Sequence, residues 1–143
     1  MLYTALTKKA LALACRVHQG QTDRYGMPLL VHIIHVAERM TDEDTTVVAL
    51  LHETMERGVL TLDDLRREGF SEKICTAVDA ITYRGQRQYI RYIRRVRENR
   101  IASVVKAADL KHDTDITRMD VITDEDSALL QKYERALRIL SRK

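Results

Sequence analysis

The chain has few of the residues that interrupt helices or cross-link loops. Its 143 residues include one proline, five glycines and two cysteines. So few helix breakers, with apolar residues recurring every three or four positions, predict helices almost throughout, and no segment alternates like a strand. The two cysteines, Cys15 and Cys75, lie far apart among apolar neighbours. We therefore expect buried free thiols rather than a disulfide.

Long apolar runs are also missing. The first segment carries Lys8, Lys9 and Arg16, where a signal peptide would need an uninterrupted apolar stretch. We therefore expect no secretion signal, no membrane span and a cytoplasmic protein. A net charge of +3 is too small to indicate a nucleic-acid partner. The sequence leaves the oligomeric state open, and a homo-oligomer remains possible.

The positive charge is unevenly distributed, because seven arginines crowd into one short stretch: Arg84, Arg87, Arg91, Arg94, Arg95, Arg97 and Arg100. At helical spacing, those at 87, 91, 94 and 95 share one side of the helix. This side could contact the phosphates of RNA, or the carboxylates of an acidic protein. The alternative is a solvated helix face. Only Tyr89 and Tyr92 are interleaved with them, so a stacking groove for single-stranded nucleic acid is weakly supported.

The length and composition are those of one globular domain. With 45% hydrophobic and 31% charged residues, a chain of this size can bury a core without disulfides. No internal repeat, low-complexity segment or linker divides it. We expect a single all-α domain over residues 1–143, built as a compact bundle of about seven or eight helices.

Capping residues and glycines set the expected helix boundaries. Gly20 should end the first helix and Gly58 the third, a loop should cover residues 21–27, and Pro28 fits the first turn of the second helix. Asp42 is expected to cap the third helix, and Thr123 the last one. The helices expected are about 3–18, 28–40, 42–57, 61–68, 71–81, 86–98, 99–108 and 123–141.

Side chains that commonly bind metals are scattered over three of these segments. His32 lies on the second helix, His52 and Glu53 on the third, and Asp109 on a distant one. Two imidazoles and two carboxylates form a mixed nitrogen and oxygen set that suits manganese, iron or zinc. Each part alone has a plainer interpretation. A histidine on an apolar helix is usually a hydrogen-bonded core residue, and a His-Glu-x-x-Glu string lacks the second histidine of a zinc motif.

Four segments in a fixed order make the metal-site interpretation more specific. They are His18-x-Gly20-Gln21-x-Asp23-Arg24-x-Gly26-x-Pro28, Val31-His32, Ala49-Leu50-Leu51-His52-Glu53-x-x-Glu56 and Val105-Lys106-Ala107-Ala108-Asp109-x-x-His112-Asp113. From about Leu2 to Leu140 the chain resembles the hydrolase domain of the RelA/SpoT family, within the HD superfamily, and most nearly its small stand-alone members. The resemblance implies an HD-domain helical bundle. Without a synthetase segment, the chain should not make (p)ppGpp.

The resemblance also implies one divalent ion, typically manganese, with iron or zinc possible. The residues that would hold it are His32, His52, Glu53 and Asp109. In the family this site removes pyrophosphate from the ribose 3′ position of (p)ppGpp, and the ion activates the attacking water. Glu56 would orient that water or move its proton.

Three further residues are implied to face the nucleotide. Arg24 and Lys106 would supply positive charge near its phosphates, with Asp113 beside them. The plainer alternatives are an exposed loop arginine for Arg24 and a capping or salt-bridging lysine for Lys106.

The chain departs from the family pattern at three positions. Glu53 replaces aspartate and reaches farther from the backbone by about 1.5 Å, one carbon-carbon bond. Arg57 replaces an acidic residue after Glu56, and Asp113 replaces asparagine. Two hypotheses follow. The chain is a metal-dependent phosphohydrolase of (p)ppGpp or a related nucleotide, with altered preference or reduced rate, or it is catalytically impaired and binds a nucleotide or partner without turnover.

Overall fold

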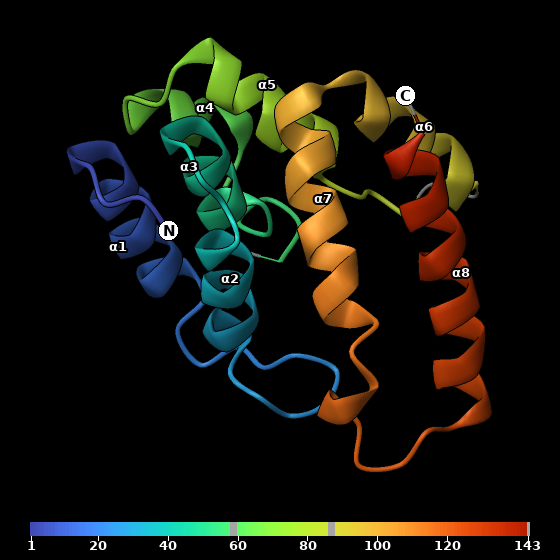
Figure 1. The fold of residues 1–143 in the computed structure, drawn as a ribbon. Coiled ribbons are helices and arrows are strands. Elements are labelled where there is room, and N and C mark those ends of the chain that lie inside the picture. Colours follow the sequence, from blue (N-terminus) through green and yellow to red (C-terminus); the bar gives the residue numbers. More distant parts are fainter. Residues whose placement is uncertain (58–59, 86–87, 143) are drawn as a thin grey trace.

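The computed structural model describes residues 1–57, 60–85 and 88–142. Its described part contains helices and one isolated bridge between Thr22 and Pro28, and no strand. The all-α expectation is confirmed (Figure 1). The elements are α1 (Ala5–Val17), α2 (Leu29–Glu38), α3 (Glu43–Leu51), α4 (Leu62–Arg67), α5 (Glu72–Ile81), α6 (Tyr89–Glu98), α7 (Arg100–Asp113), the 3-10 helix η1 (Ile116–Arg118) and α8 (Asp124–Ser141).

Polar side chains cap the helices at the positions that the sequence predicts. Asp42 accepts a hydrogen bond from the backbone N–H of Thr45 and caps α3. Thr61, Ser71, Asn99 and Thr123 each accept from a backbone N–H three residues on. Each cap satisfies an amide that a helix start would otherwise leave unpaired. These local signals therefore set where most helices begin.

Several helix boundaries differ from the prediction. α7 continues to Asp113, five residues beyond the predicted end at about residue 108. α3 ends at Leu51, whereas the pattern predicted a helix to Arg57, and residues 52–57 form turns instead. Thr54 explains the change, because both its backbone N–H (3.0 Å) and its hydroxyl (2.8 Å) donate to the carbonyl of Leu51. Pro28 lies one residue before α2 rather than in its first turn. The predicted helix stop at Gly58 and the predicted helix start at residue 86 lie outside the described residues.

The prediction for the cysteines is half wrong. Both thiols are free and Cys75 is buried, but Cys15 is exposed. The buried stripe of α1 runs through Thr7, Ala10, Leu13 and Ala14. Cys15 follows Ala14, and each residue of a helix is turned by about 100° from the last, so its side chain leaves the core.

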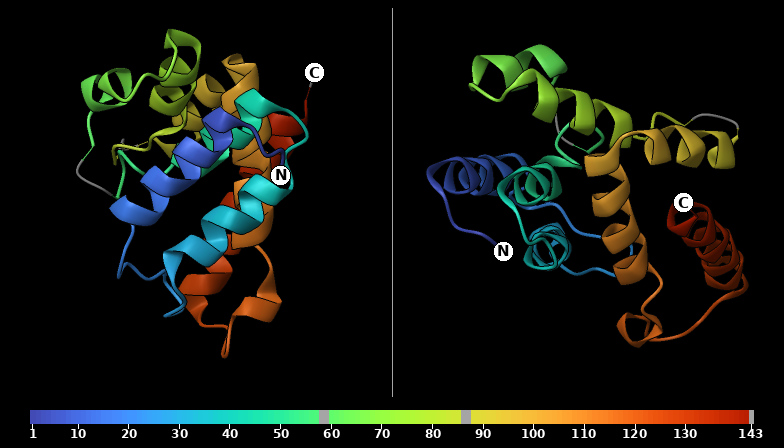
Figure 2. Two further views of the ribbon diagram at one scale, coloured as in Figure 1. Left: turned by 90° about the vertical axis from the view of Figure 1, so that its left-hand side faces the viewer. Right: turned by 45° about the horizontal axis from the view of Figure 1, so that its top comes forward.

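The core forms around α3, whose residues 45–51 are all buried. α1, α2, α5 and α7 pack against α3, and α7 in turn packs against α2, α5, α6 and α8 (Figure 2). α2, α3 and α7 therefore contact one another in pairs, which lets side chains from all three meet. None of the helices in the described residues has the length and apolar character needed to cross a bilayer.

Two loops meet at the end of the bundle where α2 begins. The loop after α1 carries Asp23 and Arg24, and the segment from η1 to α8 carries Arg118 and Asp126. Arg118 pairs with Asp23 at 2.7 Å, and Arg24 pairs with Asp126 at 2.9 Å. Figure 1 shows this loop and η1 at the bottom of the view, below α2 and α7. The two ion pairs fasten the loop after α1 to η1 and to the first turn of α8.

Candidate metal centre and its cavity

Three packed helices bring together His32 from α2, His52 at the end of α3 and Asp109 from α7. Asp109 Oδ1 lies 2.7 Å from His32 Nε2 and 3.4 Å from His52 Nε2. One ligand atom from each residue lies within 4.8 Å of the others, and all three residues are buried. Among the described residues this is the group suited to a metal ion, and the predicted Glu53 is outside it.

The imidazole of His52 is oriented as a metal ligand would be. Its Nδ1 lies 2.5 Å from the carbonyl oxygen of Ala49, to which it can only donate. Such a contact fixes the tautomer and leaves Nε2 as the free ligand atom. That buried Nε2 has no hydrogen-bond partner. Burial disfavours the charged ring, but the Asp109 carboxylate outweighs it and raises the pKa of His52 to about 9, so this place favours positive charge.

Asp109 is held between the histidines and a lysine. Its second oxygen, Oδ2, accepts from the ammonium of Lys106 at 2.8 Å. Burial would raise the pKa of Asp109, but Lys106 and the two histidines hold it well below its usual range. Lys106 therefore forms a salt bridge, and its contact with a nucleotide stays a prediction. Oδ1 faces the histidines while Oδ2 is fixed by Lys106.

Glu53 is engaged by the residue that departs most from the family pattern. Its Oε1 pairs with Arg57 Nε at 3.2 Å, one helical turn on, while its Oε2 is buried without a hydrogen-bond partner. Gln21 braces this turn, because its amide donates to the carbonyl of Arg57 at 3.2 Å. Two buried ligand-type atoms, His52 Nε2 and Glu53 Oε2, thus lack partners, which fits a site for a divalent cation.

Glu56 lies outside the cavity described below but within the electrostatic reach of the metal centre. Its Oε2 accepts from the backbone N–H of Tyr83 at 3.3 Å. Desolvation raises the pKa of Glu56, against the opposing charge of Lys106. A carboxyl whose pKa lies nearer neutrality is better suited to exchange a proton than an ordinary surface glutamate.

A cavity of about 340 Å³ opens beside His32 and Glu53. Arg24 lines it, and its guanidinium is paired with Asp126. Asp113 lines it too, and burial together with the charge of Asp109 raises its pKa to about 7. The full lining is Asp23, Arg24, Tyr25, Leu29, His32, Glu53, Arg57, Asp113, Arg118, Leu129 and Tyr133.

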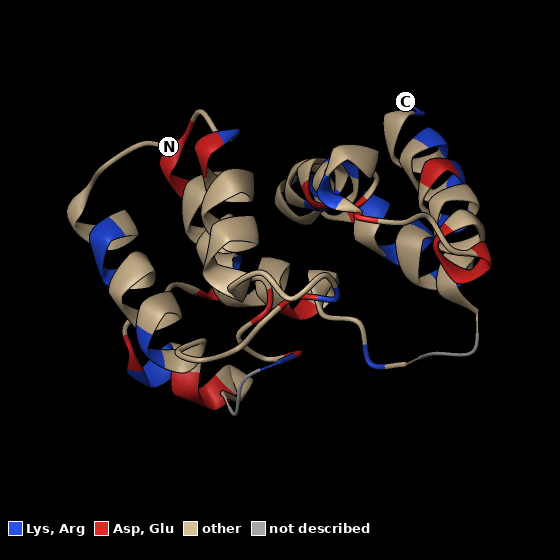
Figure 3. Cartoon of the chain, turned by 90° about the horizontal axis from the view of Figure 1, so that it is seen from below, with Lys and Arg blue, Asp and Glu red and all other residues tan. Residues whose placement is uncertain are grey.

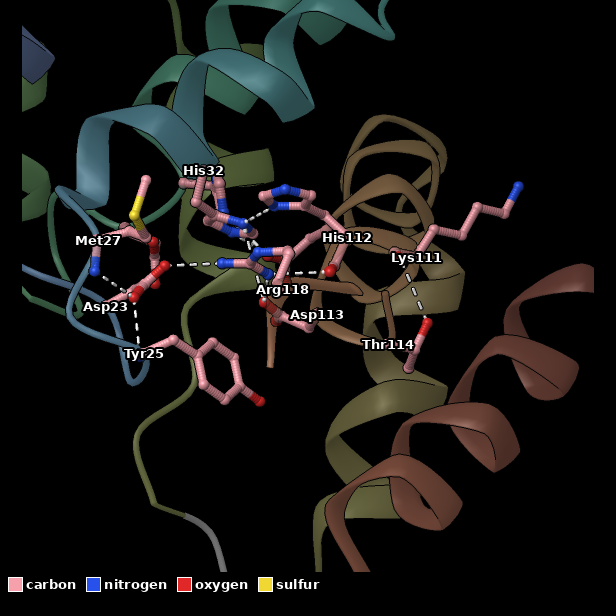
Figure 4. Close-up of polar contacts among 12 residues, drawn as sticks. Asp23, Tyr25, Met27, His32, Lys111, His112, Asp113, Thr114 and Arg118 are labelled. Carbon is pink, nitrogen blue, oxygen red and sulfur yellow. Dashed lines mark hydrogen bonds and ion pairs between the residues drawn. The ribbon is translucent and has the colours of Figure 1, made fainter. Parts of the chain in front are cut away.

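Sequence reasoning missed Arg118, which organises this cavity. Its guanidinium lies 2.7 Å from Asp23 and 3.6 Å from Asp113, and it donates to the carbonyl of His112 at 2.9 Å (Figure 4). Arg118 is thus the cation that lies beside Asp113 in this cavity. Arg118 belongs to a short 3-10 helix with no apolar period, so no sequence pattern marked it.

His112 belongs to the last of the four segments, where no function could be assigned to it from the sequence. In the structure it contacts His32. The two Nδ1 atoms lie 2.6 Å apart, so one ring donates and the other accepts. The rings also stack, with centroids 4.9 Å apart. Desolvation and the charge of Arg118 lower the pKa of His112 to about 4, which keeps this ring neutral. His112 thus orients the candidate ligand His32 without adding charge.

The described arginines of the arginine-rich stretch lie outside this site. On α6, Arg91, Arg94, Arg95 and Arg97 are exposed, while Tyr92, Ile93 and Val96 are buried. Arg87 lies outside the described residues. Figure 3 shows residues of both charge signs on the helices at each side of the molecule. A solvated face and a phosphate contact both require this exposure, so both interpretations stay predictions.

Fold and site together define a class: an all-helical bundle that encloses two histidines and an aspartate suited to a divalent ion, beside a polar cavity. The family model described as HD domain matches residues 10–112. The chain therefore belongs to the HD-domain family. This confirms the superfamily that the four segments indicated.

Relatives within the family support the narrower resemblance. The chain is 38% identical over 81 residues to a protein named GTP pyrophosphokinase from Myxococcus xanthus, a match covering 54% of this chain and 11% of that protein. It is 29% identical over 86 residues to guanosine-3′,5′-bis(diphosphate) 3′-pyrophosphohydrolase from Aquifex aeolicus (strain VF5), covering 57% and 12%. The chain thus spans about a tenth of the length of these curated relatives.

A solved structure extends the similarity to the whole fold. It is that of a metazoan ortholog of SpoT, described as hydrolysing ppGpp and acting in starvation responses. The TM-score is 0.76 at 22% sequence identity, covering 99% of this chain and 88% of that chain. The expected HD-domain helical bundle is confirmed.

Proposed function

We propose that this chain is a divalent-metal-dependent phosphohydrolase that removes pyrophosphate from the 3′ position of (p)ppGpp or a related nucleotide. The observation that carries the proposal is the buried convergence of His32, His52 and Asp109, with an unpartnered imidazole nitrogen, beside a polar cavity. The activities named for the Aquifex relative and the metazoan structure support the substrate class. Manganese suits the nitrogen and oxygen ligands, and two free cysteines suit a cytoplasmic compartment.

In this proposal His32, His52, Asp109 and Glu53 hold the ion. Bound there, the ion would polarise a phosphoryl oxygen and lower the pKa of the attacking water. The Ala49 carbonyl holds His52 in one tautomer, and Lys106 fixes one oxygen of Asp109, so both ligands are oriented in advance.

Other side chains would receive the proton and the phosphates. Glu56, with its raised pKa, is suited to accept the proton of the water. Arg24, Arg57 and Arg118 line the cavity and offer guanidinium groups to phosphate oxygens. Arg24 and Arg118 would then exchange part of their present pairing with Asp126 and Asp23 for the substrate.

The direct test is turnover. Purified protein with manganese and ppGpp should release pyrophosphate, measured by a coupled enzymatic assay or by phosphorus NMR. A reaction without manganese and with a chelator serves as the blank. No product at high protein concentration, from ppGpp, pppGpp or the other nucleotides tried, would exclude the hydrolase.

A second candidate function, nucleotide binding without turnover, is favoured by one contact. Arg57 pairs with Glu53 at 3.2 Å. Its positive charge offsets the negative charge of the carboxylate that would complete the metal site. In this case calorimetry should detect a bound nucleotide while no product forms.

The two functions separate in a variant that restores the family pattern, Glu53→Asp/Arg57→Asp/Asp113→Asn. If the three departures reduce catalysis, this variant should gain at least about 100-fold in rate, the scale of a reacting group misplaced by 1 Å. The rate of pyrophosphate release measures it, with Arg95→Asp on the exposed face of α6 as the control for the arginine-to-aspartate change. A triple variant that binds metal but is no faster than the parent would show that the departures do not limit turnover.

Metal affinity should depend on pH in a defined direction. The pKa of His52 is raised to about 9 by Asp109, so the ring carries a proton at neutral pH that must leave before Nε2 binds an ion. Affinity should therefore increase by about tenfold per pH unit between about pH 6.5 and 8.5, as expected for release of one proton. Calorimetric titration with manganese in buffers of different ionisation enthalpy measures both the affinity and the number of protons released on binding. An affinity that stays constant over this range would contradict the assignment of His52.

A further inference from the structure

A second cavity, of about 600 Å³, lies between α2 and α7. We call it the α2–α7 groove, and it shares no lining residue with the cavity beside the metal centre. Its volume is within the range of small-molecule sites. Figure 4 shows Lys111, which lines the groove, directed away from Arg118, which lines the other cavity. The groove is therefore a separate surface with its own chemistry.

Two cations in the groove are available to a ligand. Arg39, just after α2, and Lys111, on α7, are both exposed. Within the described ranges, neither side chain has a carboxylate at ion-pair distance. The one acidic residue in the lining, Asp115, is already engaged, because its Oδ1 accepts from the Thr117 amide at 3.0 Å and hydroxyl at 2.6 Å. An anionic group would meet the positive charges of Arg39, just after α2, and of Lys111, on α7, which outnumber the single negative charge of Asp115.

The rest of the lining suits a flat apolar body. Met40, Val104, Ala107 and Ala108 contribute to it, and Val104 is 42% exposed although it is apolar. His35 adds an imidazole face on the α2 side. A ligand that combines a phosphate with an aromatic base could pair its charge with the two cations and cover this apolar surface.

The groove is also connected to the candidate metal centre. The ring of His35 stacks on His112 with centroids 4.0 Å apart, and His112 stacks on His32 at 4.9 Å. Three imidazoles thus form a continuous stack from the groove to a candidate metal ligand. A ligand that moves His35 would press on the ring that orients His32.

We propose that the α2–α7 groove is a second ligand site, which binds a nucleotide through its phosphates and base and contacts the metal centre through the histidine stack. Binding in the groove does not require hydrolysis, since none of its lining residues lines the cavity that would hold the substrate. Arg39 and Lys111 hold the phosphates, and Met40 and Val104 contact the base.

The test uses GDP as the probe and methyl NMR of the full chain in buffer with excess magnesium, a diamagnetic ion. The methyl groups of Met40 and Val104 report on the groove, and those of Leu29 and Leu129 report on the other cavity. GDP should shift the first pair with saturation, whatever the outcome of the turnover assay. Shifts confined to Leu29 and Leu129, or no shift of Met40 and Val104 at millimolar GDP, would overturn the proposal.

Two comparisons sharpen the assignment. Arg39→Glu/Lys111→Glu should weaken GDP binding in the groove at least about tenfold, the result of replacing attraction by repulsion. Lys8→Glu/Arg95→Glu makes the same change in net charge at exposed positions elsewhere and should bind as the parent does. Equal losses in both variants would overturn the site. Pyrophosphate that binds as tightly as GDP would overturn the role of the apolar wall.

Discussion

Asp109→Asn should weaken manganese binding by at least about 100-fold, and pyrophosphate release should fall at least as far. The aspartate shares one oxygen with both histidines, at 2.7 and 3.4 Å. An amide removes the negative charge and leaves the Lys106 ammonium, now 2.8 Å from a neutral group, to repel the cation. Loss of a residue that only supports a metal ligand lowers metal affinity by about 10–100-fold. Loss of a ligand itself should therefore lower it further. Calorimetry with manganese measures the affinity.

Asp115→Asn is the matched control for this variant. It removes the same charge from an exposed residue six positions on, whose carboxylate bonds to Thr117 rather than to the metal centre. Metal affinity should remain at the parent value. Thermal unfolding of both variants establishes that each is folded before affinities are compared. Parent-like manganese affinity in Asp109→Asn would remove Asp109 from the site.

Lys106→Met should lower the free energy of unfolding by about 3–5 kcal/mol, the usual cost of removing one partner of a buried ion pair. The side chains of Lys106 and Asp109 are 12% and 6% exposed, and their charged atoms are 2.8 Å apart. Methionine has a similar length and fills the space, so the loss comes mainly from Asp109 Oδ2, which loses its cation while Oδ1 keeps its contacts with the two histidines. Urea denaturation of the metal-free protein at pH 8 measures the change.

The double variant Lys106→Met/Asp109→Leu separates charge from packing. It removes both members of the pair and leaves no unpaired buried charge, so most of the lost stability should return. Lys8→Met, at an exposed position on α1, is the control for lysine loss and should change stability by less than about 0.5 kcal/mol. A double variant less stable than Lys106→Met would mean that Asp109 stabilises the core without its lysine.

Local and periodic features of this protein could be predicted from sequence. Hydrophobic spacing and capping side chains such as Asp42 and Thr123 identified the helices. The order of His32, His52 and Asp109 identified the buried group. These signals work because helix periodicity and caps depend on residues within one or two turns. The predicted end of α3 was wrong, because the hydroxyl of Thr54 bonds to the carbonyl of Leu51 and competes with the helix.

Contacts between distant loops could not be predicted. Arg118 and Asp23 are 95 positions apart, and Arg24 and Asp126 are 102 apart. Neither pair follows a helical or strand period, so only the packed fold brings them together. The same holds for the stack of His35 on His112, which depends on how α2 lies against α7. The predictions for Glu53, Glu56 and Lys106 as site residues await experiment.

The account depends most on one ion bound between three helices, and anomalous scattering from a crystal grown with manganese tests this directly. Data collected on either side of the manganese absorption edge should show one strong difference peak within coordination distance of His32 Nε2, His52 Nε2 and Asp109 Oδ1. A well-ordered crystal with no manganese peak at these atoms, or with the peak elsewhere in the molecule, would contradict it.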